Sequence, residues 1–428
     1  MTLHVTPPLH YGRSTDGAKR PRLPGLLSTG WARLALARML GRIVQTGSLT
    51  VLLPDAASVV VGDGAVTGAV TVRIRDHGTL WRLALNPDLA LGEAYMDGGL
   101  TVERGTIFDL LDLMARNLAA RPKRRPGPYA KLKRLREQAN GRTAARRNVA
   151  HHYDLSLDLY RRFLDEDLQY SCAYFEQPDM TLEEAQAAKK RHLAAKLLLQ
   201  PDQRVLDIGC GWGGLALTLA EDSGVQVTGI TLSREQLAAA RSRAQGRRLT
   251  DRVEFHLQDY RDVQGPFDRI VSVGMFEHVG VPNYQAYFDA IARLLTEDGV
   301  AVVHAIGQVE ITEGTQPWIG KYIFPGGYTP ALSEVLPAIE RAGLQVTDIE
   351  ILRLHYAETL KAWRARFAAR RGEIAAHYDE RFCRMWEFYL SLSEVGFRHR
   401  GCMVFQIQLS KRIDAVPLTR DYMCDDPA

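Results

Sequence analysis

The chain has 428 residues, a net charge of +4 and 46% hydrophobic residues, which is enough for a large core and for two domains. No apolar run of about 18 residues occurs, and the N-terminus lacks the apolar stretch of a secretory signal. The five cysteines are scattered without the spacing of a zinc site, so we expect reduced thiols and no metal. These features predict a cytoplasmic protein without a membrane-spanning helix.

Positive charge is concentrated in one stretch of the chain. Between Arg116 and Ala150 there are twelve Lys and Arg residues and a single acidic residue, Glu137, so this stretch carries +11 and the remainder −7. A solvated linker often has such a composition, but the asymmetry also suits attraction to an anionic surface. Lipid headgroups and nucleic-acid phosphates both fit, and charge alone does not distinguish them.

The N-terminal part of the chain predicts a small α+β domain. Residues 1–25 lack periodicity and are expected to be loose. Alternation from Val70 to Ile74, a turn at Asp76-His77-Gly78 and a second strand over 79–85 predict a β-hairpin. Helices are predicted over residues 26–45, 89–98 and 107–117. Because no cluster of titratable residues suits chemistry, we interpret residues 26–117 as a docking domain.

A second, larger domain is predicted over 148–412, after a basic linker over 118–147 and before a tail over 413–428. From Arg204 onward, apolar strands alternate with helices, which is typical of an α/β fold with a doubly wound parallel sheet. The strands are expected near residues 204, 225, 253, 268 and 300, with a final antiparallel pair at 344–352 and 403–409. Ligands of such sheets gather at the carboxyl ends of the strands.

The first strand of this sheet runs directly into a glycine-rich turn. Gly209 and Gly211 follow Ile208, and a helix begins after Gly214, so the backbone can approach a nucleotide-like ligand closely. The spacing of Gly209, Gly211 and Gly214 also satisfies the dinucleotide pattern G-x-G-x-x-G, which alone is a weak signal. The turn therefore predicts a nucleoside site and leaves two classes of cofactor open.

The ends of the next two strands favour S-adenosylmethionine over a nicotinamide dinucleotide. The second strand ends at Thr231, where a dinucleotide site normally has an acidic residue for the ribose. The third strand ends at Gln258 and Asp259, and Asp259 is suited to accept from an adenine amino group. Asp207, just before the first glycine, adds a second acidic group.

Aromatic and aliphatic residues outside the sheet core suggest an apolar substrate such as an acyl chain. Tyr378, Phe382, Met385 and Tyr389 recur at helical spacing, which a core stripe explains better than a substrate groove does. Methylation of an alkene produces a carbocation, which needs a dry site and a base that removes a proton. Candidate groups for this chemistry are Glu277, His304, Cys172 and Tyr170.

With these residues in view, the chain resembles the cyclopropane-fatty-acyl-phospholipid synthases, a family that includes the mycolic acid cyclopropane synthases. The matching motifs lie between residues 148 and 410. They are NVAHHYD at 148–154, YSCAY at 170–174, VLDIGCGWG at 205–213, GITLS at 229–233, MFEH at 275–278, HAI at 304–306 and YIFPGG at 322–327. More weakly, the N-terminal module resembles the lipid-binding domain of the phospholipid-acting members.

The resemblance implies a class I methyltransferase fold with two bound groups. Bicarbonate would act as the base, held by Cys172, Glu277, His304, Tyr356 and the backbone at Ile306. Glu277 is suited to accept from the hydroxyl of bicarbonate, while His304 and Tyr356 donate to its oxygens. By the resemblance, S-adenosylmethionine would be bound by Tyr170, Ser171, Gly209, Gly211, Thr231, Gln236 and Gln258. Asp207, Leu232 and Asp259 are added from their positions at the strand ends.

The residues and the resemblance together give a leading hypothesis and three alternatives. The leading hypothesis is a phospholipid cyclopropane synthase that docks peripherally on the anionic inner face of the membrane through residues 116–150 and forms a homodimer. The nearest alternative produces a methyl-branched chain without ring closure. A nucleic-acid methyltransferase is disfavoured because the Asn/Asp-Pro-Pro-Tyr/Phe motif is absent, so no nucleic-acid partner is expected. A lipid-binding protein with a vestigial fold is disfavoured because the motif residues are intact.

Overall fold

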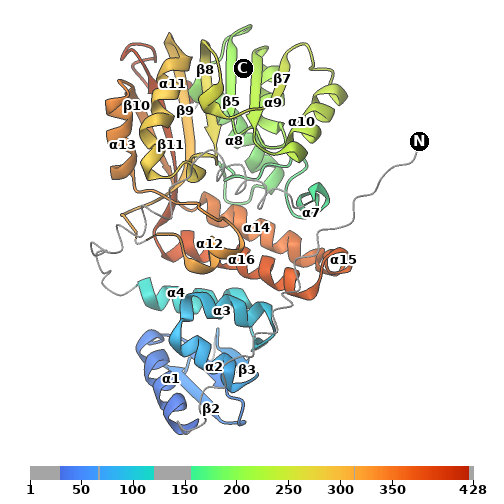
Figure 1. Ribbon diagram of the computed structural model, residues 1–428, viewed down its shortest axis with the longest axis vertical. Coiled ribbons are helices and arrows are strands. Elements are labelled where there is room, and N and C mark those ends of the chain that lie inside the picture. Colours follow the sequence, from blue (N-terminus) through green and yellow to red (C-terminus); the bar gives the residue numbers. More distant parts are fainter. Residues whose placement is uncertain (1–28, 66–67, 120–155, 313, 424–428) are drawn as a thin grey trace, which may run out of the picture.

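The computed structural model describes residues 29–65, 68–119, 156–312 and 314–423, and it begins with a small α+β module (Figure 1). The module has a four-stranded sheet in the order β2-β1-β3-β4, in which β1 and β3 are parallel and the other pairs antiparallel. Its elements are α1 (Thr29–Ile43), β1 (Ser48–Leu52), β2 (Ser58–Gly62), β3 (Val70–Ile74), α2 (His77–Leu85), α3 (Pro87–Met96), β4 (Leu100–Arg104) and α4 (Ile107–Ala119).

The predicted hairpin over residues 70–85 is wrong, because its second half is the helix α2. The Asp76 side chain accepts a hydrogen bond from the Thr79 backbone N–H at 2.8 Å, so the Asp-His-Gly stretch caps a helix and does not close a hairpin. Thr79, Leu80 and Leu83 are buried, a spacing that fits a helix and not an alternating strand. β3 pairs with β1 and β4 instead.

The remainder of the described chain is built on a seven-stranded sheet in the order β10-β11-β9-β8-β5-β6-β7. The five strands from β5 to β9 are parallel, whereas β11 is antiparallel to both β9 and β10. This arrangement confirms the predicted doubly wound α/β fold and its antiparallel end. The strands are β5 (Arg204–Ile208), β6 (Gln226–Thr231), β7 (Val253–Leu257), β8 (Phe267–Val273), β9 (Leu295–Gln308), β10 (Gln345–Leu352) and β11 (Cys402–Ser410).

Helices cover both faces of this sheet, so its central strands are apolar on both sides. In β5, Val205 packs in one hydrophobic cluster and its neighbours Leu206 and Ile208 in the other. The first cluster also contains α8 (Leu182–Leu197), α9 (Gly214–Ser223) and α10 (Arg234–Gly246). The second contains α11 (Tyr284–Leu294) and α13 (Leu332–Arg341). The carboxyl ends of the strands stay accessible between these layers.

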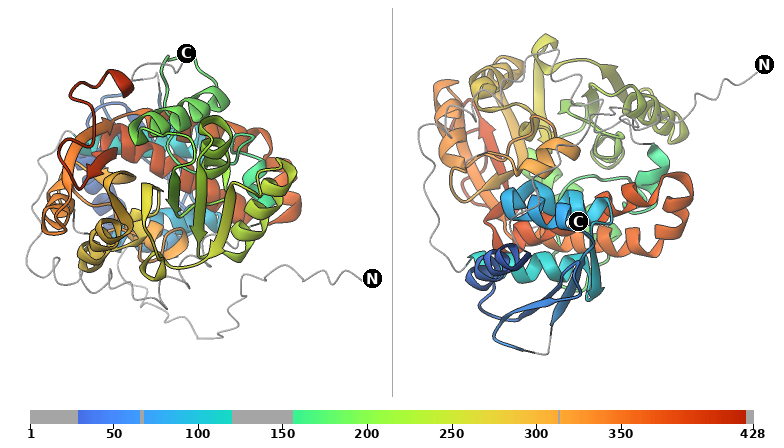
Figure 2. Two further views of the ribbon diagram at one scale, coloured as in Figure 1. Left: turned by 90° about the horizontal axis from the view of Figure 1, so that it is seen from above. Right: turned by 60° about the horizontal axis from the view of Figure 1, so that its bottom comes forward.

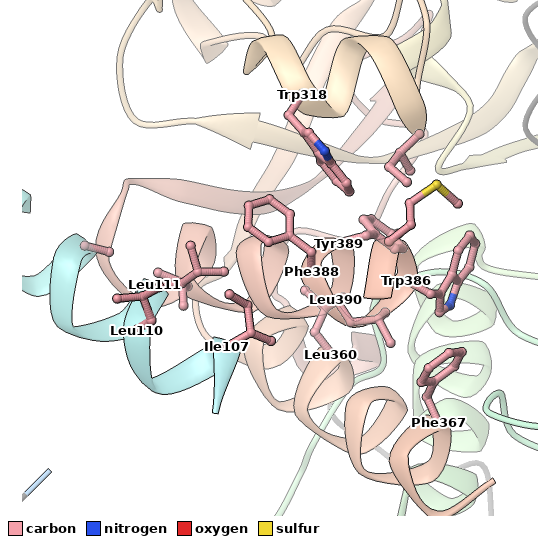
Figure 3. Packing of buried hydrophobic residues seen from close by; sticks show 14 of the residues in the cluster. Ile107, Leu110, Leu111, Trp318, Leu360, Phe367, Trp386, Phe388, Tyr389 and Leu390 are labelled. Atoms are coloured by element: carbon pink, nitrogen blue, oxygen red, sulfur yellow. The ribbon is translucent and has the colours of Figure 1, made fainter. Parts of the chain in front are cut away.

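A layer of helices lies between the sheet and the N-terminal module (Figures 1 and 2). It contains α12 (Pro317–Tyr322), α14 (His355–Ala369), α15 (Arg371–His377) and α16 (Glu380–His399). Figure 3 shows Ile107 of α4 turned toward α16, with Trp318 of α12 beside Phe388 at a ring-centroid distance of 4.6 Å. A Cβ added to Gly92 of α3 would lie 2.4 Å from the Trp318 indole nitrogen, so only glycine fits there. One continuous core therefore joins the module to the helix layer.

Short helices complete the chain. They are α7 (Leu157–Arg161), η1 (Tyr260–Asp262), η2 (Phe276–His278), η3 (Val281–Asn283) and η4 (Asp421–Met423). The predicted loose N-terminus, nearly all of the basic segment and the NVAHHYD motif at 148–154 lie outside the described residues. Within the described ranges, no helix combines the length and the hydropathy needed to cross a bilayer.

Candidate cofactor and catalytic site

The glycine turn after β5 has the backbone geometry that its sequence predicts. Gly209, Gly211 and Gly213 have φ values of 85°, 54° and 82°, in the left-handed region that favours glycine. A Cβ added to Gly209 would lie 2.9 Å from the Cβ of Met275, so a side chain there would collide with the turn after β8. α9 begins at Gly214 and presents its free N–H groups at the same edge of the sheet.

A pocket opens over this turn at the carboxyl ends of the parallel strands. All ten residues predicted to bind the cofactor line it, although they come from four separate parts of the chain. Thr231 Oγ1 donates to Gln236 Oε1 at 2.7 Å, which fixes both side chains after β6. Both oxygens of Asp259 accept from the guanidinium of Arg261, which also lines the pocket, so an adenine amino group would share these acceptors.

Asp207 at the floor of the pocket lacks a donor for one of its oxygens. The side chain is 2% exposed, and Oδ2 has no hydrogen-bond partner among the described residues. Burial raises the pKa of Asp207 to about 7. A buried carboxylate oxygen without a partner is costly, and a cationic or N–H donor on a ligand would relieve that cost. The α-ammonium group of S-adenosylmethionine has this character, so the residues present fit this cofactor.

Glu277 is the centre of a second group of buried polar residues. It lies in η2, just after β8, and its Oε1 accepts from the Ile306 backbone N–H of β9 at 2.7 Å. Its Oε2 is buried without a partner among the described residues. Burial raises the pKa of Glu277 to about 7, so this carboxyl can exchange a proton near neutral pH.

His304 lies two residues before Ile306 on β9, where its ring is held by Gln406 of the neighbouring strand β11. Gln406 Nε2 lies 3.1 Å from His304 Nδ1. With the Gln406 amide in this orientation, its nitrogen donates to Nδ1, which corresponds to the tautomer with the ring proton on Nε2. Burial lowers the pKa of His304, which keeps the imidazole neutral. His304 can therefore offer one N–H donor without carrying a charge.

The segment of Cys172 is bonded to α14, the helix that carries Tyr356. The Ala173 backbone N–H donates to Thr359 Oγ1 at 3.0 Å, and Thr359 lies one helical turn after Tyr356. The Tyr356 ring packs against Trp363 and Phe397. Burial raises the pKa of the Cys172 thiol, so the thiol is neutral and not a nucleophile, and its Sγ donates to the Ala173 carbonyl oxygen at 3.2 Å.

None of the five proposed catalytic residues lines the pocket, but sequence neighbours of two of them do. Ser171 precedes Cys172, and Met275 and His278 lie next to or near Glu277 in the sequence. Sequence reasoning missed Gln406, which holds His304, and Lys189, which is buried behind Ser171. No local signal marks Lys189, because the buried positions of α8 include Gln186 and Lys196 as well as apolar residues. Among the described residues, no group of His, Cys, Asp and Glu is arranged to hold a metal ion.

Comparison with known proteins identifies the family. The family model for mycolic acid cyclopropane synthetase matches residues 140–407, which is more than half of the chain. The chain belongs to the mycolic acid cyclopropane synthetase family. It is an S-adenosylmethionine-dependent methyltransferase of this family.

Individual relatives extend the similarity over most of the chain. The cyclopropane-fatty-acyl-phospholipid synthase of Escherichia coli K12 is 39% identical over 347 residues, covering 80% of this chain and 88% of the relative. The tuberculostearic acid methyltransferase UfaA1 of Mycobacterium tuberculosis is 38% identical, covering 81% and 86%. A crystal structure of mycolic acid cyclopropane synthase CmaA1 complexed with SAH and CTAB is 38% identical with a TM-score of 0.59, covering 62% of this chain and 97% of that chain.

Proposed function

We propose that the protein is a cyclopropane-fatty-acyl-phospholipid synthase, which adds a methylene across the cis double bond of an unsaturated phospholipid acyl chain. The observation that carries this proposal is the extent of the similarity to the Escherichia coli synthase. That similarity covers more of the chain than residues 140–407 hold, so it includes part of the N-terminal region. A relative matched over 80% of this chain is a closer guide to the substrate than a match confined to residues 140–407, and the tuberculostearic acid methyltransferase, matched over 81%, keeps the methyl-branching alternative open.

The pocket residues would hold S-adenosylmethionine, which supplies the methyl group when bound. Gly209 and Gly211 let the ligand approach the backbone, and Asp207 offers an acceptor to its ammonium group. Thr231, Gln258 and Asp259 lie at the ends of β6 and β7, and Gln236 lies in the first turn of α10 after β6, where these residues suit the ribose and adenine.

The polar group behind the pocket would hold bicarbonate, which supplies the base of the reaction when bound. Glu277 has an unpartnered buried oxygen that can accept from a hydroxyl, and His304 offers its Nε2–H. Cys172, Tyr356 and the backbone at Ile306 complete the proposed set. Because His304 and the Cys172 thiol are neutral, the set offers hydrogen-bond donors without a fixed positive charge.

The remaining parts of the chain are assigned to the lipid surface. We assign lipid docking to the N-terminal module at 26–117 and anionic headgroup attraction to the basic segment at 116–150. Each Lys or Arg near an anionic surface contributes on the order of 1 kcal/mol, so half of the twelve residues would suffice for salt-sensitive binding. The enzyme would then act peripherally on the cytoplasmic face of the membrane, as a homodimer.

The test combines the purified protein, S-adenosylmethionine, bicarbonate and vesicles of a cis-monounsaturated anionic phospholipid. Mass spectrometry and proton NMR of the acyl chains are both needed, because a ring and a methyl branch each add one CH₂. Loss of vinyl protons with new high-field ring protons supports the synthase. A mass gain with vinyl protons retained would instead favour the methyl-branching alternative, which the similarity to the tuberculostearic acid methyltransferase keeps in view. No mass gain would refute the substrate assignment.

A further inference from the structure

Lys189 is a fully buried cation directly behind the cofactor pocket. It projects from α8, is 0% exposed and does not line the pocket itself. Its Nζ donates to Gln169 Oε1 at 2.6 Å and to Ser171 Oγ at 2.8 Å, and both of these residues line the pocket. Both hydrogen-bond acceptors are neutral, whereas the carboxylates of Asp165 and Asp167 attract the ammonium group from nearby and oppose the burial that lowers the pKa of Lys189 to about 8. The direct contacts of this buried cation are therefore made with the pocket wall.

The two hydrogen bonds fix where protons point on the pocket wall. An ammonium group only donates, so Ser171 Oγ accepts from Lys189, and its own hydroxyl proton is left to point elsewhere. Gln169 is fixed in the same way, because its Oε1 accepts from Lys189 while its amide nitrogen donates to Asp167 Oδ2 at 2.9 Å. Ser171 thus becomes a donor toward the pocket, and the positive charge behind it strengthens that donor.

The order of the strands indicates which part of the cofactor lies beside Ser171. β6 and β7 lie on one side of β5, and the residues that suit ribose and adenine follow these two strands. The rest of the pocket, over the glycine turn and along the segment of Gln169 and Ser171, is left for the amino-acid end. That end carries an ammonium and a carboxylate group. Asp207 offers an unpartnered acceptor there, and Ser171 offers a donor backed by a cation.

We propose that Lys189 is a positioning residue for the amino-acid end of S-adenosylmethionine, which acts through Ser171 by making its hydroxyl a donor to the carboxylate of the ligand. Lys189 reaches the ligand only through Ser171, so it is not a catalytic residue. The inference rests on the cofactor of this family and is independent of the lipid that the enzyme modifies.

The experiment is a calorimetric titration of wild type and Lys189→Met with two ligands. S-adenosylhomocysteine carries the amino-acid end, whereas 5′-methylthioadenosine keeps the adenosine and lacks that end. We expect Lys189→Met to weaken the binding of S-adenosylhomocysteine on the order of 10- to 100-fold and the binding of 5′-methylthioadenosine less than about 3-fold. The reason is that a hydrogen bond to a charged group is removed for the first ligand alone. Equal weakening of both ligands would mean a structural role and would overturn the proposal, as would no weakening at all.

Two further variants keep the test decisive. Ser171→Ala should reproduce the ligand discrimination, and adding Lys189→Met to it should change affinity by less than about 3-fold, because the two residues act as one unit. If Lys189→Met does not fold, Ser171→Ala alone must show the discrimination, or the proposal fails. Lys196→Met is the matched control, because Lys196 is equally buried on the same face of α8 but pairs with Glu350, away from the pocket. It should lower thermal stability and leave both affinities unchanged; a loss confined to S-adenosylhomocysteine would contradict the proposal.

Discussion

Glu277→Gln should stabilise the folded protein at high pH, although it removes a carboxyl that we assign to the reaction. Burial raises the pKa of Glu277 from 4.5 to about 7, so the folded protein binds this proton more tightly than the unfolded chain does. Stability contributed by Glu277 is therefore complete below about pH 4.5 and is lost as the pH rises through about 7. The pKa rises by about 2.5, from 4.5 to about 7, and each unit corresponds to about 1.4 kcal/mol. The full loss of stability is therefore about 3 kcal/mol.

Gln is a suitable replacement because its amide oxygen can still accept from the Ile306 backbone N–H, and it carries no charge at any pH. We expect the variant and the wild type to have the same melting temperature near pH 4.5, and the variant to melt on the order of 5 °C higher at pH 8. Differential scanning calorimetry across this pH range measures the difference directly. Activity on vesicles should fall at every pH.

A matched control distinguishes this effect from a general effect of removing a buried carboxylate. Glu394 is 1% exposed but is paired with Arg364 and Arg398, so Glu394→Gln should destabilise the protein at pH 8. If Glu277→Gln gave the same change in melting temperature at pH 4.5 and pH 8, or destabilised the protein at pH 8, the burial argument for Glu277 would be refuted.

Four other outcomes follow from the structure and the sequence. Gly209→Ala should weaken S-adenosylhomocysteine binding at least about 10-fold in a titration, because φ is 85° and a Cβ would meet Met275; unchanged affinity would contradict the proposed site. Gln406→Glu should favour a proton on His304 Nδ1 and lower activity at least about 10-fold, and NMR of the ring nitrogens would reveal an unchanged tautomer if this reasoning fails. Trp318→Ala should cost about 3–5 kcal/mol in thermal unfolding, since Trp318 is fully buried between α3 and α16; a loss below about 1 kcal/mol would refute that packing. Charge reversal in the basic segment should reduce vesicle sedimentation and leave cofactor affinity unchanged, whereas unaltered sedimentation would rule out docking through that segment. The residues to reverse are Lys123, Arg124, Arg125, Lys131 and Lys133.

The parallel sheet could be predicted from the sequence because its signals are local. Each strand is a short apolar run, and the first runs into glycines that only a tight turn requires, as at Gly209 and Gly211. The hairpin prediction failed for the opposite reason. Asp76 can begin either a turn or a helix, and the choice depends on whether Leu80 and Leu83 find a core to bury against. That information is tertiary and is absent from the local pattern.

The site shows the same division. The glycine turn and the residues after β6 and β7 could be located because the fold places all strand ends at one edge. Gln406, which orients His304, and Lys189, which orients Ser171, could not be located in this way. They lie 102 and 18 residues away in the sequence from the residues that they orient. A buried Gln or Lys has no sequence motif, and its role is apparent only from the partner that it holds.

The segment from Gln169 to Phe175 explains how the cofactor pocket and the proposed catalytic residues are kept in register. Two helices from different layers hold its odd-numbered residues. Lys189 of α8 bonds to Gln169 and Ser171, while Thr359 and His355 of α14 accept from the backbone N–H groups of Ala173 and Phe175 at 3.0 and 2.9 Å. Cys172 lies at the centre of this span. α8 packs on the sheet, whereas α14 packs on α16, which contacts the N-terminal module. Since both layers hold the same short segment, a relative shift of the sheet and the helix layer would have to displace Cys172.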